Sequence, residues 1–559
     1  MDTQVLSTEH VLPARRSAAC VPVPLISAPS VAAPYAQALL FYDKQGAAAL
    51  DPNALSRSLA QTLSAYPQLA GRLVLPPTTP STSFPDRPPP TTPSTSFPDR
   101  PPPTTPSTSF PDPPPPTTPS TSFPAYTRRF LRPWMEYGSD DPGFLLTFER
   151  RIGPLSAILP SPTQWDRVYD SSAIDFDLAP ATAPNLSPSN PRTEKPLSGA
   201  KITLFDDGAA LVVGISHVLA DAGALGTFVE DWATIHALLP SQVEVAVDEL
   251  VKKRRFDWET LDAYAAGDLD AAHPDPALEK LEEGLDVLRY DAWARGATHP
   301  PEAMDAKPDP AILELDAARG HKRGQPAPWG LLGTEPCKRY VLTFSASEVE
   351  RITASARLHA PKASANDAFV AHLWRLITRA RLQITGELEF TMACDARRRL
   401  NADDTPGCFN ICLGLNSPAK EVLQDGWAER RIRAAVDGVT EERVGAWLHR
   451  RAHDLDFRRE MICFPGTQSV CTTNWARSGV CTLDFGGGGP VYAHNLVQAF
   501  GGFATILKGR GDGVEMGGKN GGGEKGDKWY EPGVNVMLWL EESAMERLVR
   551  DPALRGYRG

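Results

Sequence analysis

Residues 215–223 read Ile-Ser-His-Val-Leu-Ala-Asp-Ala-Gly, and they follow the apolar run 211–215, which comes after an Asp-Asp-Gly turn. A short apolar run behind a turn predicts a buried strand. From Ala222 onward the apolar residues recur with helical spacing, at Leu225, Phe228, Val229 and Trp232. His217 and Asp221 therefore fall in the sharp segment between a strand and a helix. An imidazole is the usual group for taking a proton from a hydroxyl or an amine, so His217 is a candidate general base.

A second motif lies far downstream, where residues 483–490 read Leu-Asp-Phe-Gly-Gly-Gly-Gly-Pro, shortly after the Thr-Thr-Asn-Trp-Ala-Arg segment 472–477. Taken together, the two motifs resemble those of the BAHD family of acyl-CoA-dependent acyltransferases, which carry HxxxDG and DFGWG in this order. They resemble more loosely the wider group of HxxxD transferases that includes fungal trichothecene acetyltransferases. The chain departs from the pattern twice. Ala222 separates Asp221 from Gly223, and Gly487 stands where the family has tryptophan.

The resemblance extends over most of the chain. Matching segments are Tyr-Pro-Gln-Leu-Ala-Gly-Arg-Leu at 66–73, Ser-Ala-Asn-Asp-Ala at 364–368 with Trp-Arg at 374–375, Asp-Ala-Arg-Arg-Arg-Leu at 395–400, Gly-Cys-Phe-Asn at 407–410, and the final strand and helix from 534 to 545. It implies a two-domain α/β protein of the chloramphenicol-acetyltransferase-like type, with mixed sheets flanked by helices and the active-site channel between the halves. A chain of 559 residues also exceeds a single hydrophobic core. We expect an N-terminal domain at 1–235, a crossover at 236–335 and a C-terminal domain at 336–559.

The resemblance also implies a mechanism. His217 takes the proton of an acceptor hydroxyl or amine, which attacks the thioester of acyl-CoA directly, so no acyl-enzyme forms and no cofactor is permanently bound. Asp221 points away from the substrate and pairs with Arg397, with Asn410 as a neighbour.

Other motif positions take two implied roles. Thr473 and Trp475 lie on the substrate side in the family. The positions implied to be structural are Asp484, Phe485, Gly486 and Gly488.

Composition excludes several other classes. A net charge of −11 argues against a nucleic-acid partner. The eight cysteines are scattered without a CxxC pair, so a disulfide scaffold or a zinc ribbon is unsupported, and no metal site is expected. No apolar run has the length of a membrane span and the first twenty residues lack a signal core, so we expect a cytoplasmic protein, as a monomer.

Two other patterns are explained by ordinary structure and not by a functional site. His449 and His453 stand one helical turn apart, but Arg450 occupies the place where a zinc protease needs glutamate, so we expect a solvated helix face. The glycine run 486–489 is not followed by Lys-Ser/Thr and opens no helix, which excludes a phosphate-binding loop.

Two segments are predicted to be insertions. Thr-Thr-Pro-Ser-Thr-Ser-Phe-Pro recurs at residues 78, 91, 104 and 117, so 76–124 is expected to be a disordered, proline-rich insert in the first domain. Its Pro-Asp-Arg-Pro units also fit ligands of SH3 domains, but an expanded repeat in a surface loop is favoured. The second insert is a glycine-rich loop at 509–526.

Local patterns predict several individual elements. Leu55, Leu59 and Leu63 indicate an early helix, and Ser345 with Glu348 forms a capping box after an alternating strand. An amphipathic helix is expected over 278–293, within an otherwise polar crossover.

Two alternatives to a CoA-dependent acyltransferase remain at this point. Condensation domains of peptide synthetases share the fold and the HxxxDG motif, but they prefer a second histidine where Ser216 stands. A non-catalytic binding protein on the same scaffold is suggested by Gly487 and by the proline-rich insert.

Overall fold

The structure is a computed structural model of the whole chain. It describes residues 3–33, 35–75, 132–159, 168–180, 192–239, 243–254, 256–291, 294, 313–314, 317, 324–403, 405–457, 460–461, 463–497, 499–509 and 528–555. The predicted proline-rich insert and nearly all of the predicted glycine-rich loop lie outside these residues.

The first large sheet has the strand order β1-β6-β8-β9-β3-β17 within the described residues. Its strands are β1 (Thr3–Val11), β3 (Ala36–Asp43), β6 (Phe144–Arg151), β8 (Ser198–Leu204), β9 (Gly208–Ile215) and β17 (Tyr492–His494). β6 and β8 are parallel and the other neighbours are antiparallel. β8 and β9 form a hairpin, and the predicted strand over 211–215 is the last part of β9, which ends two residues before His217.

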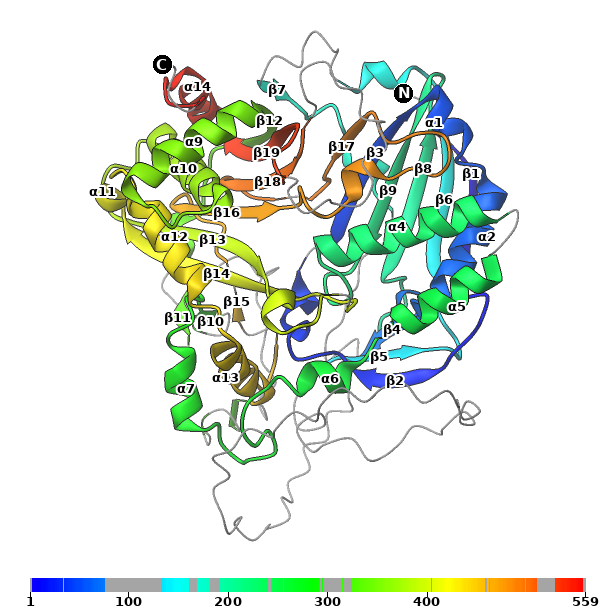
Figure 1. The fold of residues 1–559 in the computed structure, drawn as a ribbon, viewed down its shortest axis with the longest axis horizontal. Coiled ribbons are helices and arrows are strands. Elements are labelled where there is room, and N and C mark those ends of the chain that lie inside the picture. The colour runs from blue at the N-terminus through cyan, green and yellow to red at the C-terminus, as the bar shows by residue number, and fades with distance from the viewer. Residues whose placement is uncertain are drawn as a thin grey trace.

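Helices cover one face of this sheet (Figure 1). They are α2 (Pro52–Leu63), α4 (Ala222–Leu238) and α5 (Val243–Lys253). The predicted leucines of α2 and the four predicted apolar residues of α4 are all buried, because they form the stripes that these helices turn toward the sheet. Both helix predictions are confirmed.

The second large sheet has the order β14-β13-β16-β18-β19-β12-β7 within the described residues. Its strands are β7 (Val168–Asp170), β12 (Cys337–Ser345), β13 (Glu387–Asp395), β14 (Asn410–Pro418), β16 (Ser469–Asn474), β18 (Phe503–Lys508) and β19 (Gly533–Glu541). β16 runs parallel to both of its neighbours, so this sheet is also mixed.

Helices pack on the second sheet as well (Figure 1). They are α9 (Ala346–His359), α10 (Ala365–Ala380), α12 (Trp427–Asp437) and α14 (Glu542–Arg550). Ser345 caps α9 and Ser364 caps α10, each in a capping box that satisfies free backbone donors at the helix start. The Trp374 ring of α10 stacks on Phe390 of β13 with ring centroids 4.8 Å apart, which fixes the helix on the sheet.

Smaller elements complete the fold. The short strands are β2 (Ala19–Pro22), β4 (Arg72–Val74), β5 (Trp134–Tyr137), β10 (Tyr290–Asp291), β11 (Gln325–Pro326) and β15 (Glu460–Met461). The remaining helices are α1 (Lys44–Ala48), α6 (Trp258–Asp262), α7 (Pro276–Glu282), α11 (Ala419–Val422) and α13 (Glu441–Ala452). No helix in the described part of the chain has the length and apolar character needed to cross a membrane.

Each large sheet receives one strand from the far half of the sequence. β17 pairs with β3 of the first sheet, and β7 pairs with β12 of the second. The predicted α/β class, with mixed sheets flanked by helices, is confirmed. The domain boundaries at 235 and 336 remain a prediction, and the exchanged strands tie the two halves together.

The predicted helix over 278–293 is wrong in its second half. Helix α7 ends at Glu282, and Tyr290 and Asp291 form β10 instead. The chain turns at Gly284, which packs against the guanidinium of Arg443, and then extends along the second sheet. The amide of Gly414 bonds the carbonyl of Asp286 there at 2.9 Å, and such tertiary pairing overrides the local helical pattern.

The predicted solvated face at His449 and His453 is also wrong, because both imidazoles are buried with ring centroids 4.6 Å apart. His449 lies under the loop before α7. Its Nε2 accepts the amide of Asp275 at 2.9 Å, and its Nδ1 donates to the carbonyl of Ala266 at 2.7 Å. The two histidines therefore have a packing role, which one-turn spacing alone could not reveal.

Candidate active site

His217 lies in the turn that joins β9 to α4. The turn is closed by hydrogen bonds from the amides of Leu219 and Ala220 to the carbonyl of Ser216, at 2.8 and 3.2 Å. Val218, Leu219 and Ala220 are buried and anchor the turn, whereas His217 itself is only half-buried. The predicted strand–turn–helix setting is confirmed, and the backbone around the imidazole is fixed on both sides.

The surroundings of His217 favour its neutral form. Burial lowers the pKa of the imidazole below its usual value, against the opposing effects of the Asp221 charge and a hydrogen bond to the backbone of Ala220. A neutral imidazole keeps a lone pair on one ring nitrogen, which is what a general base needs.

Asp221 supports the turn from behind and has only 2 % of its surface exposed. Its Oδ1 accepts the amide of Ala224 at 2.9 Å, so the side chain caps the N-terminus of α4. Its Oδ2 accepts the amide of Phe409, from the distant second half of the chain, also at 2.9 Å. Every contact holds the carboxylate away from solvent, as a structural support requires.

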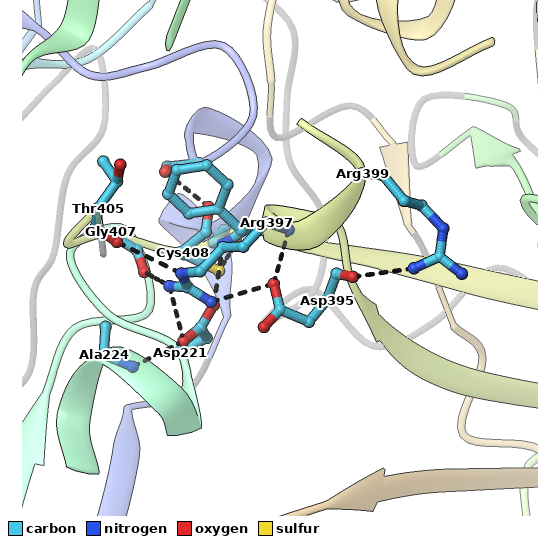
Figure 2. Close-up of polar contacts among 11 residues, drawn as sticks. Asp221, Ala224, Asp395, Arg397, Arg399, Thr405, Gly407 and Cys408 are labelled. Atoms are coloured by element: carbon cyan, nitrogen blue, oxygen red, sulfur yellow. Dashed lines mark hydrogen bonds and ion pairs between the residues drawn. The ribbon is translucent and has the colours of Figure 1, made fainter. Parts of the chain in front are cut away.

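Arg397, just beyond β13, completes this support (Figure 2). Its Nη1 donates to Asp221 Oδ2 at 2.8 Å and its Nη2 donates to Oδ1 at 3.1 Å, a two-pronged ion pair. The predicted pairing of Asp221 with Arg397 is therefore present in the structure. Burial would lower the pKa of Arg397, but the charges of Asp221 and Asp395 outweigh it, so the guanidinium stays charged.

The guanidinium is in turn held by its own half of the chain. Arg397 Nη2 donates to the carbonyl of Gly407 at 2.6 Å, and Nη1 donates to the carboxylate of Asp395 at 3.2 Å (Figure 2). The Phe409 ring lies 4.6 Å from the guanidinium carbon, which adds a cation–π contact. Asn410, implied as a neighbour, is the first residue of β14 and lies opposite Asp395 in the ladder. Sequence reasoning had not identified Asp395 or the Phe409 amide, and a backbone donor leaves no signal in a sequence.

Thr473 and Trp475 lie at the end of β16 in the second sheet. Thr473 is half-buried, and the amide of buried Trp475 bonds the carbonyl of Ile506 at 2.8 Å. The chain then turns back against α4 at Gly226, where an added Cβ would lie 1.7 Å from the carbonyl oxygen of Ser478. This close approach brings the end of β16 beside the beginning of α4, and so toward the turn of His217. Gly226 was also missed, although a glycine inside a helical pattern is a usable signal.

The loop 484–489 lies elsewhere. Phe485 packs edge-on against Trp232 of α4 at 5.3 Å between ring centroids. Trp232 follows Asp221 by eleven residues, and at 1.5 Å per residue it lies about 16 Å farther along the helix. Asp484 Oδ1 accepts the amides of Gly486 and Gly488 at 2.7 and 2.8 Å, and both glycines have a positive φ that favours glycine. The structure thus places these four motif positions away from His217.

The described residues hold no group of three or more His, Cys, Asp or Glu side chains arranged to bind a metal ion.

The sequence model named "Transferase family" matches residues 169–264 and 334–517, about half of the chain. The chain is 22% identical over 420 residues to acyltransferase abl6 of Leptosphaeria maculans, an alignment that covers 69% of the chain and 74% of the relative. It is 25% identical over 329 residues to hydroxycinnamoyltransferase 2 of Oryza sativa subsp. japonica, covering 56% of the chain and 62% of that relative.

Solved structures share the fold. F. graminearum TRI101 complexed with coenzyme A and T-2 mycotoxin superposes with a TM-score of 0.56 and 15% identity, over 97% of this chain and 99% of that one. Vinorine synthase gives a TM-score of 0.53 with 16% identity, over 98% and 96%. At such identities the likeness shows the common two-domain architecture, which the sequence had predicted.

Proposed function

Because this chain belongs to the transferase family, and within it to the BAHD-type acyltransferases, we propose that it moves an acyl group from acyl-CoA to a small-molecule hydroxyl or amine. The coenzyme A bound in the structural neighbour and the names of both relatives support this donor and this reaction. The observation that carries the proposal is the Asp221–Arg397 ion pair beneath a half-buried His217, whose pKa is lowered by burial. A general base must be held in a fixed position, and an ion pair with the second half of the chain fixes the turn that carries it.

In the proposed reaction, the free nitrogen lone pair of His217 takes the proton of the acceptor as the acceptor attacks the thioester carbonyl. The tetrahedral intermediate then collapses, the carbon–sulfur bond breaks, and His217 returns the proton to the sulfur of coenzyme A. Both substrates meet in one complex, so no acyl-enzyme forms and no permanently bound cofactor is needed. Positioned acid–base catalysis of this kind contributes about 10²- to 10⁴-fold.

Asp221 and Arg397 act as positioning residues in this scheme. Neither touches the reacting atoms, because both Asp221 oxygens are occupied by Arg397, Ala224 and Phe409. Thr473 and Trp475 are proposed to border the bound substrate from the second sheet, and Asp484, Phe485, Gly486 and Gly488 to shape a structural loop.

The proposal is tested with the purified protein by following free thiol released from acetyl-, malonyl- and hydroxycinnamoyl-CoA with a panel of alcohols and amines. Release that depends on the acceptor supports the CoA-dependent reaction. Transfer only from carrier-bound donors would instead identify a condensation-type enzyme, and no transfer from either donor would identify a binding protein.

The pH dependence of kcat/KM then tests the state of His217. A base must be deprotonated to act, and burial lowers the pKa of this imidazole below its ordinary value of 6.5. We therefore expect kcat/KM to be flat above pH 6.5 and to fall tenfold per pH unit only below the lowered pKa. An acidic limb with its midpoint above 6.5 would contradict a neutral His217 at physiological pH.

A further inference from the structure

Along β16, the side chains on the two faces of the second sheet differ in exposure. On β16, Val470 and Thr472 are each 2 % exposed, whereas Cys471 and Thr473 between and beyond them are half-buried. Asn474, on the side of Thr472, bonds Asn366 of α10 at 2.8 Å, so this side faces the helices. Cys471 and Thr473 point the opposite way.

This opposite side of the sheet faces the first sheet. Thr473 pairs with Thr505, and Thr505 pairs with Met537 of β19, so all three point the same way. The sulfur of Met537 accepts the amide of Asn495, the residue after β17, at 3.2 Å. The side that carries Cys471 and Thr473 therefore faces the first sheet, and on this side Thr473 is proposed to border the substrate.

Three thiols gather on this side. Cys412 of β14 lies opposite Ala393, and Cys471 lies opposite Thr391, two residues away on the same side of β13. Cys463 comes from the segment after β15, which lies over this side because the amide of Phe464 bonds the Glu389 carboxylate at 3.2 Å. All three cysteines are free and partly exposed.

Two of these thiols come from neighbouring positions. Phe464 follows Cys463 and bonds Glu389, and Glu389 lies two residues along β13 from Thr391, which pairs with Cys471. The interaction of the two thiols lowers the pKa of Cys463 and raises the pKa of Cys471. A thiol of lowered pKa beside a second thiol is the arrangement in which oxidation ends in a disulfide and not in a higher oxide.

We propose that Cys463 and Cys471 form a reversible oxidation site that changes the surface of the second sheet beside Thr473. With hydrogen peroxide as oxidant, the Cys463 thiolate attacks one peroxide oxygen and becomes a sulfenic acid, and the oxygen–oxygen bond breaks to release hydroxide. The Cys471 thiolate then attacks the Cys463 sulfur, the disulfide forms and a second hydroxide leaves. The two thiol protons convert both hydroxides to water, so peroxide is reduced by the two electrons that the thiols lose.

The effect on catalysis rests on the proposed function. A disulfide holds its two sulfurs at bonding distance, so oxidation draws the segment of Cys463 onto β16. Cys471 is two residues from Thr473 on the same side, and the shift changes the surface in front of it. Because small displacements of substrate-positioning groups cost catalysis heavily, we expect kcat/KM to fall by about tenfold on oxidation.

The bond itself is tested by mass spectrometry. The native protein is treated with peroxide, quenched with catalase, alkylated after unfolding and digested with trypsin. Residues 460–477 form one tryptic peptide whose only cysteines are Cys463 and Cys471, so the disulfide appears there as the loss of two hydrogens without alkylation. Two alkylated cysteines, a cross-link to the peptide of Cys412, or added oxygens would overturn the proposal.

The control of catalysis is tested on the same samples by chromatography of the acylated acceptor. Wild type should lose about tenfold in kcat/KM and recover with dithiothreitol. Cys463→Ser, on the covering segment, should keep its activity in peroxide, while Cys20→Ser, a partly exposed thiol on β2, should respond like wild type. A disulfide that forms without any loss of kcat/KM would overturn the proposed effect on the surface beside Thr473. If the reduced enzyme transfers no acyl group at all, the proposed function fails, while the mass measurement still decides the oxidation site.

Discussion

The turn around Asp221 and the loop around Asp484 both carry a motif aspartate, yet the two carboxylates have different partners. Asp221 is buried and bonds Arg397 and the Phe409 amide, 176 and 188 residues away. Asp484 is exposed, and its hydrogen bonds go to amides of its own loop. The first aspartate joins the two halves of the chain beneath His217, whereas the second shapes a local turn.

The second departure from the family pattern, Gly487, falls in the loop around Asp484. A Cβ at Gly487 would lie 2.7 Å from the carbonyl oxygen of Gln45 and 2.9 Å from the Cα of Gly46, so the loop is closed onto α1. The missing tryptophan is thus replaced by direct backbone packing, in a region about three turns of α4 from the catalytic turn. The catalytic turn itself keeps its full set of partners.

The largest loss of stability is expected from breaking the buried Asp221–Arg397 ion pair. Asp221→Asn and Arg397→Met should each lower the free energy of unfolding by about 3–5 kcal/mol, because each leaves a buried polar partner uncompensated. Each should also reduce acyl transfer. The double variant should lose less than the sum of the single losses, measured by chemical unfolding. Additive losses would show that the two side chains do not interact.

A smaller loss of stability is expected where α4 packs against the chain that follows β16. Gly226→Ala forces α4 away from the Ser478 carbonyl, and should cost about 1–3 kcal/mol and lower kcat/KM. Gly223→Ala is the matched control. Its Cβ would meet its nearest neighbour, Asp221 Oδ1, at 3.4 Å, an ordinary contact, so stability should stay equal or rise by up to about 1 kcal/mol. Equal thermal shifts in the two variants would contradict the close approach at Gly226.

The smallest loss of stability is expected from changes in the loop around Asp484. Asp484→Ala removes the acceptor for two exposed amides, and should lower the free energy of unfolding by about 1 kcal/mol. Asp484→Asn keeps an oxygen in place and should lose less. Because the loop lies far from His217, acyl transfer should stay within about threefold of wild type in both variants. A collapse of kcat in Asp484→Ala with the fold intact would place the loop in the active site.

The sequence predicted the strongly periodic parts of this fold, because their apolar residues follow the helical or strand repeat that burial imposes. The strand over 211–215 and helices α2 and α4 are of this kind, and the start of α9 followed from its capping box. The helix over 278–293 failed because residues after Gly284 gain more from lying along the second sheet. His449 and His453 were misjudged since one-turn spacing does not say which side of a helix is covered.

The site was predictable only in part for a similar reason. His217 could be placed from the strand–helix pattern, but the partner of Asp221 came from resemblance, because no local pattern joins residues 176 positions apart. The Phe409 amide and the carbonyl opposite Gly226 are backbone groups, and every residue type has them. Such contacts depend on how distant segments meet, which only the folded chain shows.

The role of His217 is tested most directly by the turnover of His217→Ala beside wild type, with thermal unfolding of both proteins. We expect a loss of at least about 10²-fold in kcat, because the general base is removed, with a nearly unchanged melting temperature, because the ring is only half-buried. Near-normal acyl transfer by a folded His217→Ala protein would contradict the role of His217 as the base.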